Sequence, residues 1–373
     1  MTKRKILFVR LGHFSFTNRS LLAQIRKRYP DHEIIDFEVK AAIKKRPLEV
    51  LIGLTVEAVH YGIGVLFDAG ERHGYFFKNP YVFERISSHF REQFAPLRDE
   101  IDLVVQTQGL FNAALPGVPL LVYTDYTLRS VRFTETHFPE RFQAQEVELY
   151  HRADAIAVSA SHAKATLVQD YGCAPDKVHV VYIGSNIESD FENFSLARYA
   201  AQKICFVGIE WDRKGGEYLV EAFLQLTEQF PDASLTIVGC TPAVSHPKIR
   251  TTGKISPDEV KEILKESSIF CLPSIVEPSS VAVIEAATYG LPVVGTLTGG
   301  FPDAIEDGVS GLLVPIRDSR SLAGALGALL ADPQRALEMG RAARKRARET
   351  FNWDIVGAKL VPVIDSLMSS ARP

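Results

Sequence analysis

The chain has 373 residues, which is enough for two domains at about 100–200 residues each. Its composition, 46% hydrophobic, 23% charged and 10% aromatic, is that of a globular protein and excludes a disordered, collagen-like or coiled-coil chain. The formal net charge of −3 provides no overall basic field of the kind that nucleic-acid binding requires.

Short apolar runs alternate with helical patterns along the chain. Predicted strands in the first half are Lys5–Arg10, Glu33–Val39, Asp102–Gln106, Leu120–Thr124, Ala155–Val158 and Val178–Ile183. Those in the second half are Ile204–Val207, Ser234–Val238, Ile269–Leu272, Pro292–Gly295 and Gly311–Val314. This alternation predicts an α/β fold of two doubly wound units with parallel sheets. The polar and aromatic segment 186–202 has no clear period, so we place the boundary there, between domains 1–186 and 187–355.

Basic residues are concentrated near the N-terminus, where residues 1–46 carry 12 Lys or Arg against 4 Asp or Glu. One interpretation is a basic edge that meets an anionic partner. The other is a solvated helix face around Arg26–Arg28 followed by a loop at Lys44–Arg46. A second basic run, Arg341–Arg348 in the helical tail, is interpreted as a solvated helix face.

Other features bear on the location of the protein. The four cysteines have no CxxC spacing and are interpreted as reduced thiols of a cytoplasmic protein. The apolar run Ile6–Val9 is too short for a signal-peptide core, so we expect no targeting segment. The apolar stretch Leu51–Phe67 is broken by Glu57 and His60, which predicts a buried or interfacial helix and not a membrane span.

The segment Pro273–Pro292 is the most informative for chemistry. It predicts a loop followed by a helix that Ser280 caps and that ends at Gly290, with Glu285 as the charged residue on an otherwise apolar helix. A buried carboxylate needs donors, and two sugar hydroxyls would suit it. The amides around Ser279–Val281 would suit a diphosphate. Alternatively, Glu285 pairs with a core Arg or Lys, and Glu277 in the loop is a surface carboxylate.

A second cluster supplies positive charge. Gly208 directly follows the predicted strand Ile204–Val207, and Arg213 and Lys214 come after it, before a helix begins. Ligands in open α/β sheets bind beyond the carboxyl ends of the strands, so these cations are placed to neutralise phosphate.

Residues 203–355 resemble the nucleotide-sugar domain of glycosyltransferase family 4, which comprises retaining enzymes of the GT-B fold. The resemblance rests on Phe206–Gly208, Thr252–Ser256, the Glu277-x7-Glu285 signature, Gly299–Asp303, Asp307–Gly308, Gly311–Val314 and Phe351–Trp353. It implies two Rossmann-like domains that face each other across a cleft, with acceptor binding in residues 1–186 and donor binding in 187–355. The last helix, within 356–373, would cross back onto the first domain.

The resemblance also implies roles for individual residues. Glu285 would bind the ribose hydroxyls, Glu277 would lie beside the donor sugar, and Lys214 would neutralise the leaving diphosphate. The backbone of Lys254, Ile255 and Ser256 would edge the base.

Two departures from the family pattern affect the donor site. Ile209 replaces the usual basic residue after Gly208, so Arg213 is expected to supply that charge. Ser279 and Ser280 replace the usual Phe-Gly pair and add hydroxyls near the sugar or phosphate.

The first half resembles the family more weakly, through Ala153–Ala155, Tyr171–Gly172 and Gly184–Asn186. Gly12, His13 and Phe14 follow the first strand and are expected on the acceptor side of the cleft. Asp125 stands where many relatives have His; it would orient the acceptor or a sugar hydroxyl, or else cap a turn.

These features predict a retaining hexosyltransferase that uses a nucleotide-diphosphate sugar and a hydroxyl acceptor, with no cofactor or metal, because no DxD triplet or metal-ligand spacing occurs. The expected setting is the synthesis of a bacterial envelope or exopolysaccharide glycan or a glycolipid, in the cytoplasm or at the inner face of the membrane. The alternatives are a nucleotide-sugar epimerase of the same architecture and a non-catalytic sugar-nucleotide-binding protein.

Overall fold

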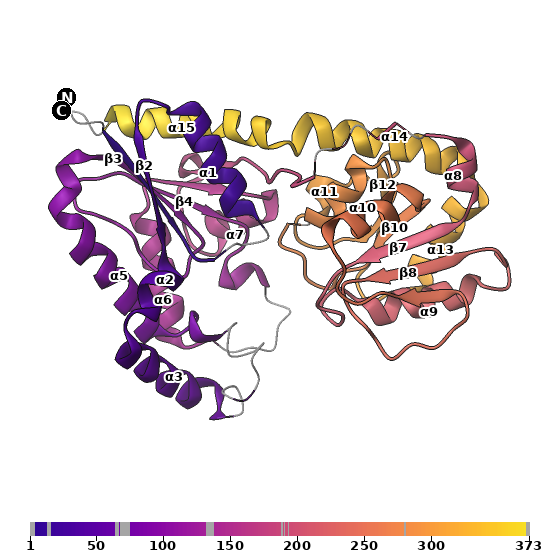
Figure 1. The fold of residues 1–373 in the computed structure, drawn as a ribbon, viewed down its shortest axis with the longest axis horizontal. Coiled ribbons are helices and arrows are strands. Elements are labelled where there is room, and N and C mark those ends of the chain that lie inside the picture. Colours follow the sequence, from indigo (N-terminus) through magenta and orange to yellow (C-terminus); the bar gives the residue numbers. More distant parts are fainter. Residues whose placement is uncertain are drawn as a thin grey trace. The chain divides into compact units, whose positions relative to one another are not determined.

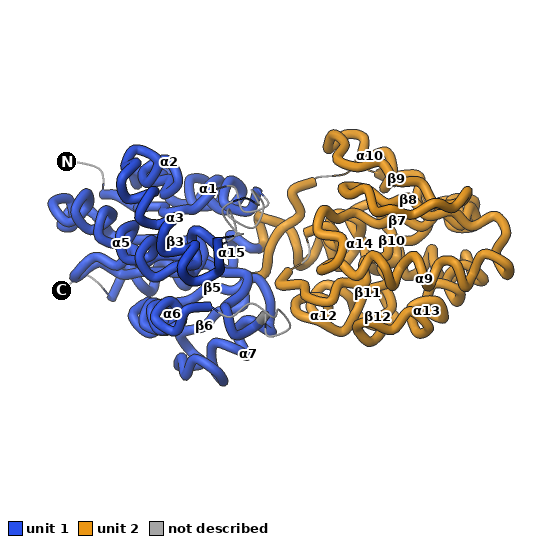
Figure 2. Tube along the Cα trace, turned by 90° about the horizontal axis from the view of Figure 1, so that it is seen from below, with its two compact units in different colours: residues 1–181, 356–373 blue, residues 182–355 orange. Residues whose placement is uncertain are grey.

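The computed structural model describes residues 4–12, 16–63, 67, 75–131, 138–187, 189, 191–192, 194–279 and 281–370. The chain forms two compact units, residues 1–181 with 356–373 and residues 182–355 (Figure 2). Each unit contains a six-stranded parallel sheet on which helices pack (Figure 1). The predicted α/β fold with two parallel sheets is therefore confirmed.

Unit 1 has the strand order β2-β1-β3-β4-β5-β6. The strands are β1 (Lys5–Arg10), β2 (Glu33–Glu38), β3 (Ile101–Thr107), β4 (Leu120–Thr124), β5 (Ala155–Val158) and β6 (Val178–Val180). The helices are α1 (Thr17–Arg28), α2 (Val39–Lys44), α3 (Pro47–Tyr61), α5 (Pro80–Phe94), α6 (Glu140–Arg152), α7 (Ser161–Gln169) and most of α15 (Trp353–Ser370). Short 3₁₀ turns lie at Ala95–Glu100, Leu128–Val131 and Pro175–Lys177.

Unit 2 has the strand order β12-β11-β10-β7-β8-β9. The strands are β7 (Lys203–Val207), β8 (Ser234–Val238), β9 (Ile249–Thr251), β10 (Ile269–Leu272), β11 (Val293–Thr296) and β12 (Gly311–Val314). The helices are α8 (Leu196–Ala200), α9 (Gly216–Leu226), α10 (Pro257–Glu266), α11 (Val281–Thr288), α12 (Phe301–Ala304), α13 (Ser319–Ala331) and α14 (Pro333–Thr350).

The burial of the central strands explains why strands could be predicted from the sequence. Every residue of β3, β4, β5, β10 and β11 is buried. Parallel strands that are covered on both faces need apolar residues at successive positions. Such strands therefore occur in the sequence as continuous apolar runs, and each of the eleven predicted strands corresponds to a strand of the structure. The twelfth strand, β9, was not predicted because it is a three-residue edge strand with an exposed Arg250 at its centre.

The structure divides the chain between Val181 and Tyr182, and again inside α15 between Ile355 and Val356. The segment after Val181 is held by unit 2, where Ser185 N donates to Phe351 O at 2.8 Å. The later part of α15 packs on unit 1, where the Tyr29 hydroxyl donates to Asp365 Oδ1 at 2.9 Å.

The interpretation of Arg341–Arg348 as a solvated face is wrong for Arg344, which is only 4% exposed. Its guanidinium donates to Phe191 O and to Glu192 Oε1, the latter at 2.9 Å, and stacks on the Phe194 ring. Carbonyls in the irregular segment before α8 need donors, and an arginine can supply several at once. Arg344 therefore fixes that segment to α14.

Candidate active site

Three loops meet at the carboxyl edge of the sheet in unit 2. They follow β7, β10 and β11, which lie side by side, and the direction in which the chain adds strands reverses between β7 and β10. Ile275 N donates to Arg213 O at 2.9 Å, and Gly300 N donates to Glu277 O at 3.0 Å. Open α/β sheets bind ligands at such a reversal point, so this edge is the candidate active site.

Glu277 lies at the centre of the three loops and is 4% exposed. Lys214 Nζ donates to Glu277 Oε2 at 2.5 Å, and Ser274 Oγ donates to the same oxygen at 3.0 Å. The Thr296 hydroxyl in turn donates to Ser274 O at 2.5 Å. The alternative of a surface carboxylate at Glu277 is therefore excluded. Removing either charge would leave the other one buried without compensation.

Arg213 lies beside this pair and contacts two of the loops. Its guanidinium donates to Val276 O at 2.8 Å and to Glu210, and Nη1 lies 4.0 Å from Glu277 Oε2. These contacts join the loop after β7 to the loop after β10.

Two glycines allow the loops to approach so closely. Gly215 has φ +65°, and a Cβ there would lie 2.1 Å from Pro273 O. Gly299 has φ +50°, and a Cβ there would lie 1.7 Å from Glu277 O. Any larger residue would push the loops apart, because these neighbours are backbone atoms.

Helix α11 begins four residues after Glu277 and carries Glu285. Burial raises the pKa of Glu285 to about 7. Within the described residues, no hydrogen bond or ion pair reaches this carboxylate. The alternative that Glu285 pairs with a core Arg or Lys is therefore not seen in this part of the chain. A carboxylate in this state gains from donors that a ligand brings.

The remaining predicted donor-side residues occupy the same edge of the sheet. Gly208 N continues the ladder by donating to Val238 O at 2.9 Å, and Ser279 and Val281 flank the start of α11. Ser280 lies outside the described residues.

Lys254, Ile255 and Ser256 follow β9, and Lys254 is exposed. Ser256 has a capping role: its hydroxyl accepts from Glu259 N at 3.3 Å, and its own N–H donates to Glu259 Oε2 at 2.8 Å. The Ser256 carbonyl accepts from Val260 N at 3.1 Å, so both backbone groups of Ser256 already take part in capping and starting α10.

Fewer of the predicted residues of unit 1 can be described. Gly12 follows β1, and its N–H donates to Glu38 Oε1 at 2.9 Å. His13 and Phe14 lie outside the described residues. Asp125 is half-buried in the loop directly after β4, at the carboxyl edge of that sheet.

Sequence reasoning missed a buried carboxylate behind this loop. Glu146 on α6 accepts from Leu128 N at 3.2 Å and from the Tyr171 hydroxyl, and burial raises its pKa to about 7. A signal was present, because Phe142, Glu146 and Leu149 follow helical spacing and the two apolar residues mark the buried face. Ser274 was also missed, since a single serine in a loop has no pattern.

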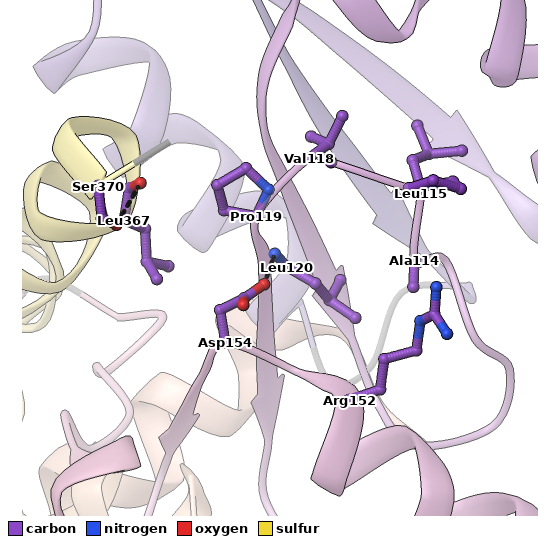
Figure 3. Close-up of a pocket in the computed structure, with 11 residues that line it drawn as sticks. Ala114, Leu115, Val118, Pro119, Leu120, Arg152, Asp154, Leu367 and Ser370 are labelled. Atoms are coloured by element: carbon purple, nitrogen blue, oxygen red, sulfur yellow. Dashed lines mark hydrogen bonds between the residues drawn. The ribbon is translucent and has the colours of Figure 1, made fainter. Parts of the chain in front are cut away.

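A cavity of about 370 Å³ lies at the other edge of the sheet in unit 1 (Figure 3). Among its lining residues are Pro119, Arg152, Asp154 and Leu367. Asp154 accepts from Leu120 N at 2.8 Å at the beginning of β4. This cavity borders the amino ends of β4 and β5, so it does not belong to the candidate site.

The described residues contain neither a metal-binding cluster nor a membrane-spanning helix. Among the described residues, no group of three or more His, Cys, Asp or Glu side chains could hold a metal ion. In the same part of the chain, no helix has both the length and the apolar character needed to cross a bilayer.

Part of the second half of the chain matches a known family. Residues 201–332 match the family model described as glycosyl transferases group 1. A D-inositol 3-phosphate glycosyltransferase from Corynebacterium aurimucosum is 28% identical over 285 residues, which are 68% of this chain and 68% of the relative. The corresponding enzyme from Corynebacterium glutamicum is 27% identical over 64% of this chain and 65% of its own length.

Solved structures match over almost the whole chain. A sucrose-phosphate synthase from Thermosynechococcus elongatus has a TM-score of 0.70 and 18% identity, covering 98% of this chain and 100% of that one. Anabaena Alr3699/HepE in complex with UDP-glucose has a TM-score of 0.67 and 16% identity, covering 97% and 100%. Residues 201–332 are therefore similar to the glycosyl transferases group 1 family, and the chain is a glycosyltransferase with the two-sheet GT-B fold.

Proposed function

We propose that the chain is a retaining hexosyltransferase that moves a hexose from a nucleotide-diphosphate sugar to a hydroxyl of its acceptor. The observation that carries this proposal is the buried Lys214–Glu277 pair at the reversal point of the sheet, next to the start of α11. A sugar nucleotide that dissociates needs positive charge beside its diphosphate and negative charge beside its sugar ring. The lysine and the helix N-terminus would supply the first, and the carboxylate would supply the second.

The charges match the transfer step. As the bond between the anomeric carbon and the diphosphate oxygen breaks, negative charge grows on the diphosphate and positive charge on the sugar ring. Lys214 and the first-turn amides of α11 would stabilise the diphosphate, and Glu277 would stabilise the ring. The acceptor oxygen forms the new bond, so the products are the glycoside, the nucleoside diphosphate and a proton.

Glu285 would bind the ribose of the donor. Its carboxylate has a raised pKa because it is buried, and two ribose hydroxyls would supply the donors that the described residues do not. Ribose binding would then favour the charged carboxylate and lower this pKa.

The names of two relatives bear on the choice of donor and acceptor. HepE was solved in complex with UDP-glucose, and the corynebacterial relatives are named D-inositol 3-phosphate glycosyltransferases. We propose a UDP-sugar donor and an acceptor from bacterial envelope or exopolysaccharide glycan or glycolipid synthesis. The reaction would need no cofactor or metal and would take place in the cytoplasm, where the basic N-terminal region would meet an anionic membrane.

Thermal unfolding with UDP-, GDP- and ADP-sugars tests the donor site. Sugar nucleotides of one base, which we propose to be uracil, should raise the Tm of the unmutated protein, because a ligand that binds only the folded state stabilises it. Glu285→Gln should abolish the shift. Glu262→Gln is the matched control, since this carboxylate on α10 is exposed and pairs with Lys265 at 2.6 Å. No shift with any sugar nucleotide would contradict the proposed function.

Product analysis tests the reaction itself. The α or β configuration of the donor should be kept in the product, as read by proton NMR, and EDTA should not change the rate. Conversion of the donor alone to an epimer would favour the epimerase alternative. Donor binding without turnover on any acceptor of a glycan panel would favour the binding protein.

A further inference from the structure

Helix α3 of unit 1 has an apolar outward face. Leu48, Leu51, Ile52 and Val59 lie in a stripe along one side of the helix and are 69%, 61%, 37% and 78% exposed. Thr55, also exposed, lies among them, and its hydroxyl donates to Leu51 O at 3.0 Å. Ile63, just beyond the end of the helix, is 69% exposed. Of the twelve large hydrophobic side chains exposed in the described part of the chain, six lie within residues 48–67. Figure 1 shows α3 at the outer end of unit 1, away from the sheet.

The charged groups of α3 face the protein. Glu49 accepts from Arg85 Nη2 at 3.0 Å and lies 2.5 Å from His89 Nε2, and Glu57 is fully buried. An ordinary surface helix has the reverse arrangement, with apolar residues inward and charges outward. Helix α3 therefore has apolar residues on both its inward and its outward side, and neither of its glutamates is exposed.

Packing on α5 holds this orientation. Asn79 Nδ2 donates to Gly53 O at 3.1 Å, and a Cβ on Gly53 would lie 2.8 Å from Val82 Cγ2. The helix cannot turn its outward stripe toward the core without losing these contacts. The stripe is a permanent surface of unit 1.

Positive charge stands next to the stripe. Lys44, Lys45 and Arg46 are all exposed and come directly before α3, and Arg46 Nη1 lies 3.6 Å from Glu49 Oε1. We propose that the outward face of α3, together with these three residues, docks unit 1 on a lipid bilayer that contains anionic lipids. The apolar stripe would lie in the interface and the basic residues would contact the headgroups. The inference rests on the proposed function for its purpose, the presentation of a membrane-linked acceptor, and on α3 for its geometry.

The size of the stripe favours lipid over a second copy of the chain. A helix of 15 residues is about 22 Å long and about 10 Å wide, so one face covers about 200 Å². A stable protein interface needs about 800 Å² from each partner. The adjacent basic cluster complements anionic headgroups, and the helix is too short to span the bilayer.

Vesicle flotation of the full chain tests the proposal, with vesicles of phosphatidylcholine alone or mixed with phosphatidylglycerol. The parent should float with the mixed vesicles. Leu51→Gln with Val59→Gln should weaken binding about tenfold or more, since two aliphatic side chains no longer enter the acyl region. Lys44→Gln with Lys45→Gln should weaken it and remove most of its salt dependence. Leu224→Gln, which changes an exposed leucine on α9, should bind like the parent.

Several outcomes would overturn the proposal. These are no binding of the parent to anionic vesicles, equal binding by the α3 variants and Leu224→Gln, or a dimer of the parent that Leu51→Gln with Val59→Gln dissociates. All variants change exposed side chains, so their Tm values and Tm shifts with UDP-sugars should match the parent. Vesicle binding without any Tm shift by a sugar nucleotide would refute the proposed function but would still support membrane docking through α3.

Discussion

The carboxyl edges of the two sheets both have buried glutamates, and these are satisfied in different ways. In unit 1, Glu146 accepts from Leu128 N and from the Tyr171 hydroxyl, so protein donors fix it to the loop after β4. In unit 2, Glu277 is held by Lys214 and Ser274, while Glu285 has no hydrogen-bond or ion-pair partner among the described residues. A carboxylate whose donors all come from the protein supports the structure. A carboxylate without protein donors, or one paired with a lysine that can turn to a ligand, can take part in ligand binding.

Breaking the Lys214–Glu277 pair should have the largest effect. Lys214→Ala leaves Glu277 buried without its cation and should lower the free energy of unfolding by about 3–5 kcal/mol. It also removes the cation proposed for the diphosphate, so the transfer rate should fall about 100-fold or more. Denaturant unfolding and initial rates measure the two effects.

A double variant separates structure from catalysis at this pair. Lys214→Met with Glu277→Gln removes both buried charges and should recover most of the lost stability without recovering transfer. Lys261→Ala is the control, because this partly exposed lysine pairs with the exposed Asp258 and should change stability by less than about 1 kcal/mol. Recovery of activity in the double variant would assign the pair a structural role only.

Glu146 should behave in the opposite way. Glu146→Ala leaves the Leu128 N–H and the Tyr171 hydroxyl without their acceptor and should cost about 2–3 kcal/mol of unfolding free energy. Glu146→Gln keeps an acceptor and removes a buried charge, so its stability should stay within about 1 kcal/mol of the parent. The UDP-sugar affinity of both variants, measured by calorimetry, should equal that of the parent. Weaker donor binding would show that the two edges are not separate in function.

The sequence predicted most of the fold because the central strands are buried runs. Leu120–Thr124 and Ile269–Leu272, for example, have the predicted bounds. It also singled out Lys214 and Glu277 as separate features, and their roles in transfer remain predictions. Their contact could not be predicted, because the two residues are 63 positions apart and meet only when β7 and β10 pair.

Other features depend on tertiary packing in the same way. Glu285 could be identified as a carboxylate in apolar surroundings because its helix is apolar, and the structure shows it half-buried. The inward turn of Glu49 on α3 could not, since its partners Arg85 and His89 come from a distant helix. The polarity pattern of the sequence identifies charged residues in apolar surroundings, whereas tertiary packing determines which of these residues contact each other.

The pH dependence of stability should reveal the smallest difference between the edges. Burial raises the pKa of both Glu285 and Glu146 to about 7, above the ordinary value of 4.5. The folded state therefore holds protons that the unfolded chain releases, so this stability is present below about pH 4.5 and is lost as pH rises through about 7. Glu285→Gln should reduce that loss by about 1–2 kcal/mol, as measured by denaturant unfolding at a series of pH values.

Donor binding distinguishes the two glutamates further. If ribose hydroxyls donate to Glu285, UDP-sugar affinity should rise with pH toward about 7 and binding should release a proton, which calorimetry in buffers of different ionisation enthalpy detects. Glu146→Gln should retain this proton release, because its carboxylate is already bonded by protein donors. Glu285→Gln should lose both the release and most of the affinity. Proton release that persists in Glu285→Gln would mean that another group meets the ribose, and Glu285 would then be, like Glu146, a carboxylate of the scaffold.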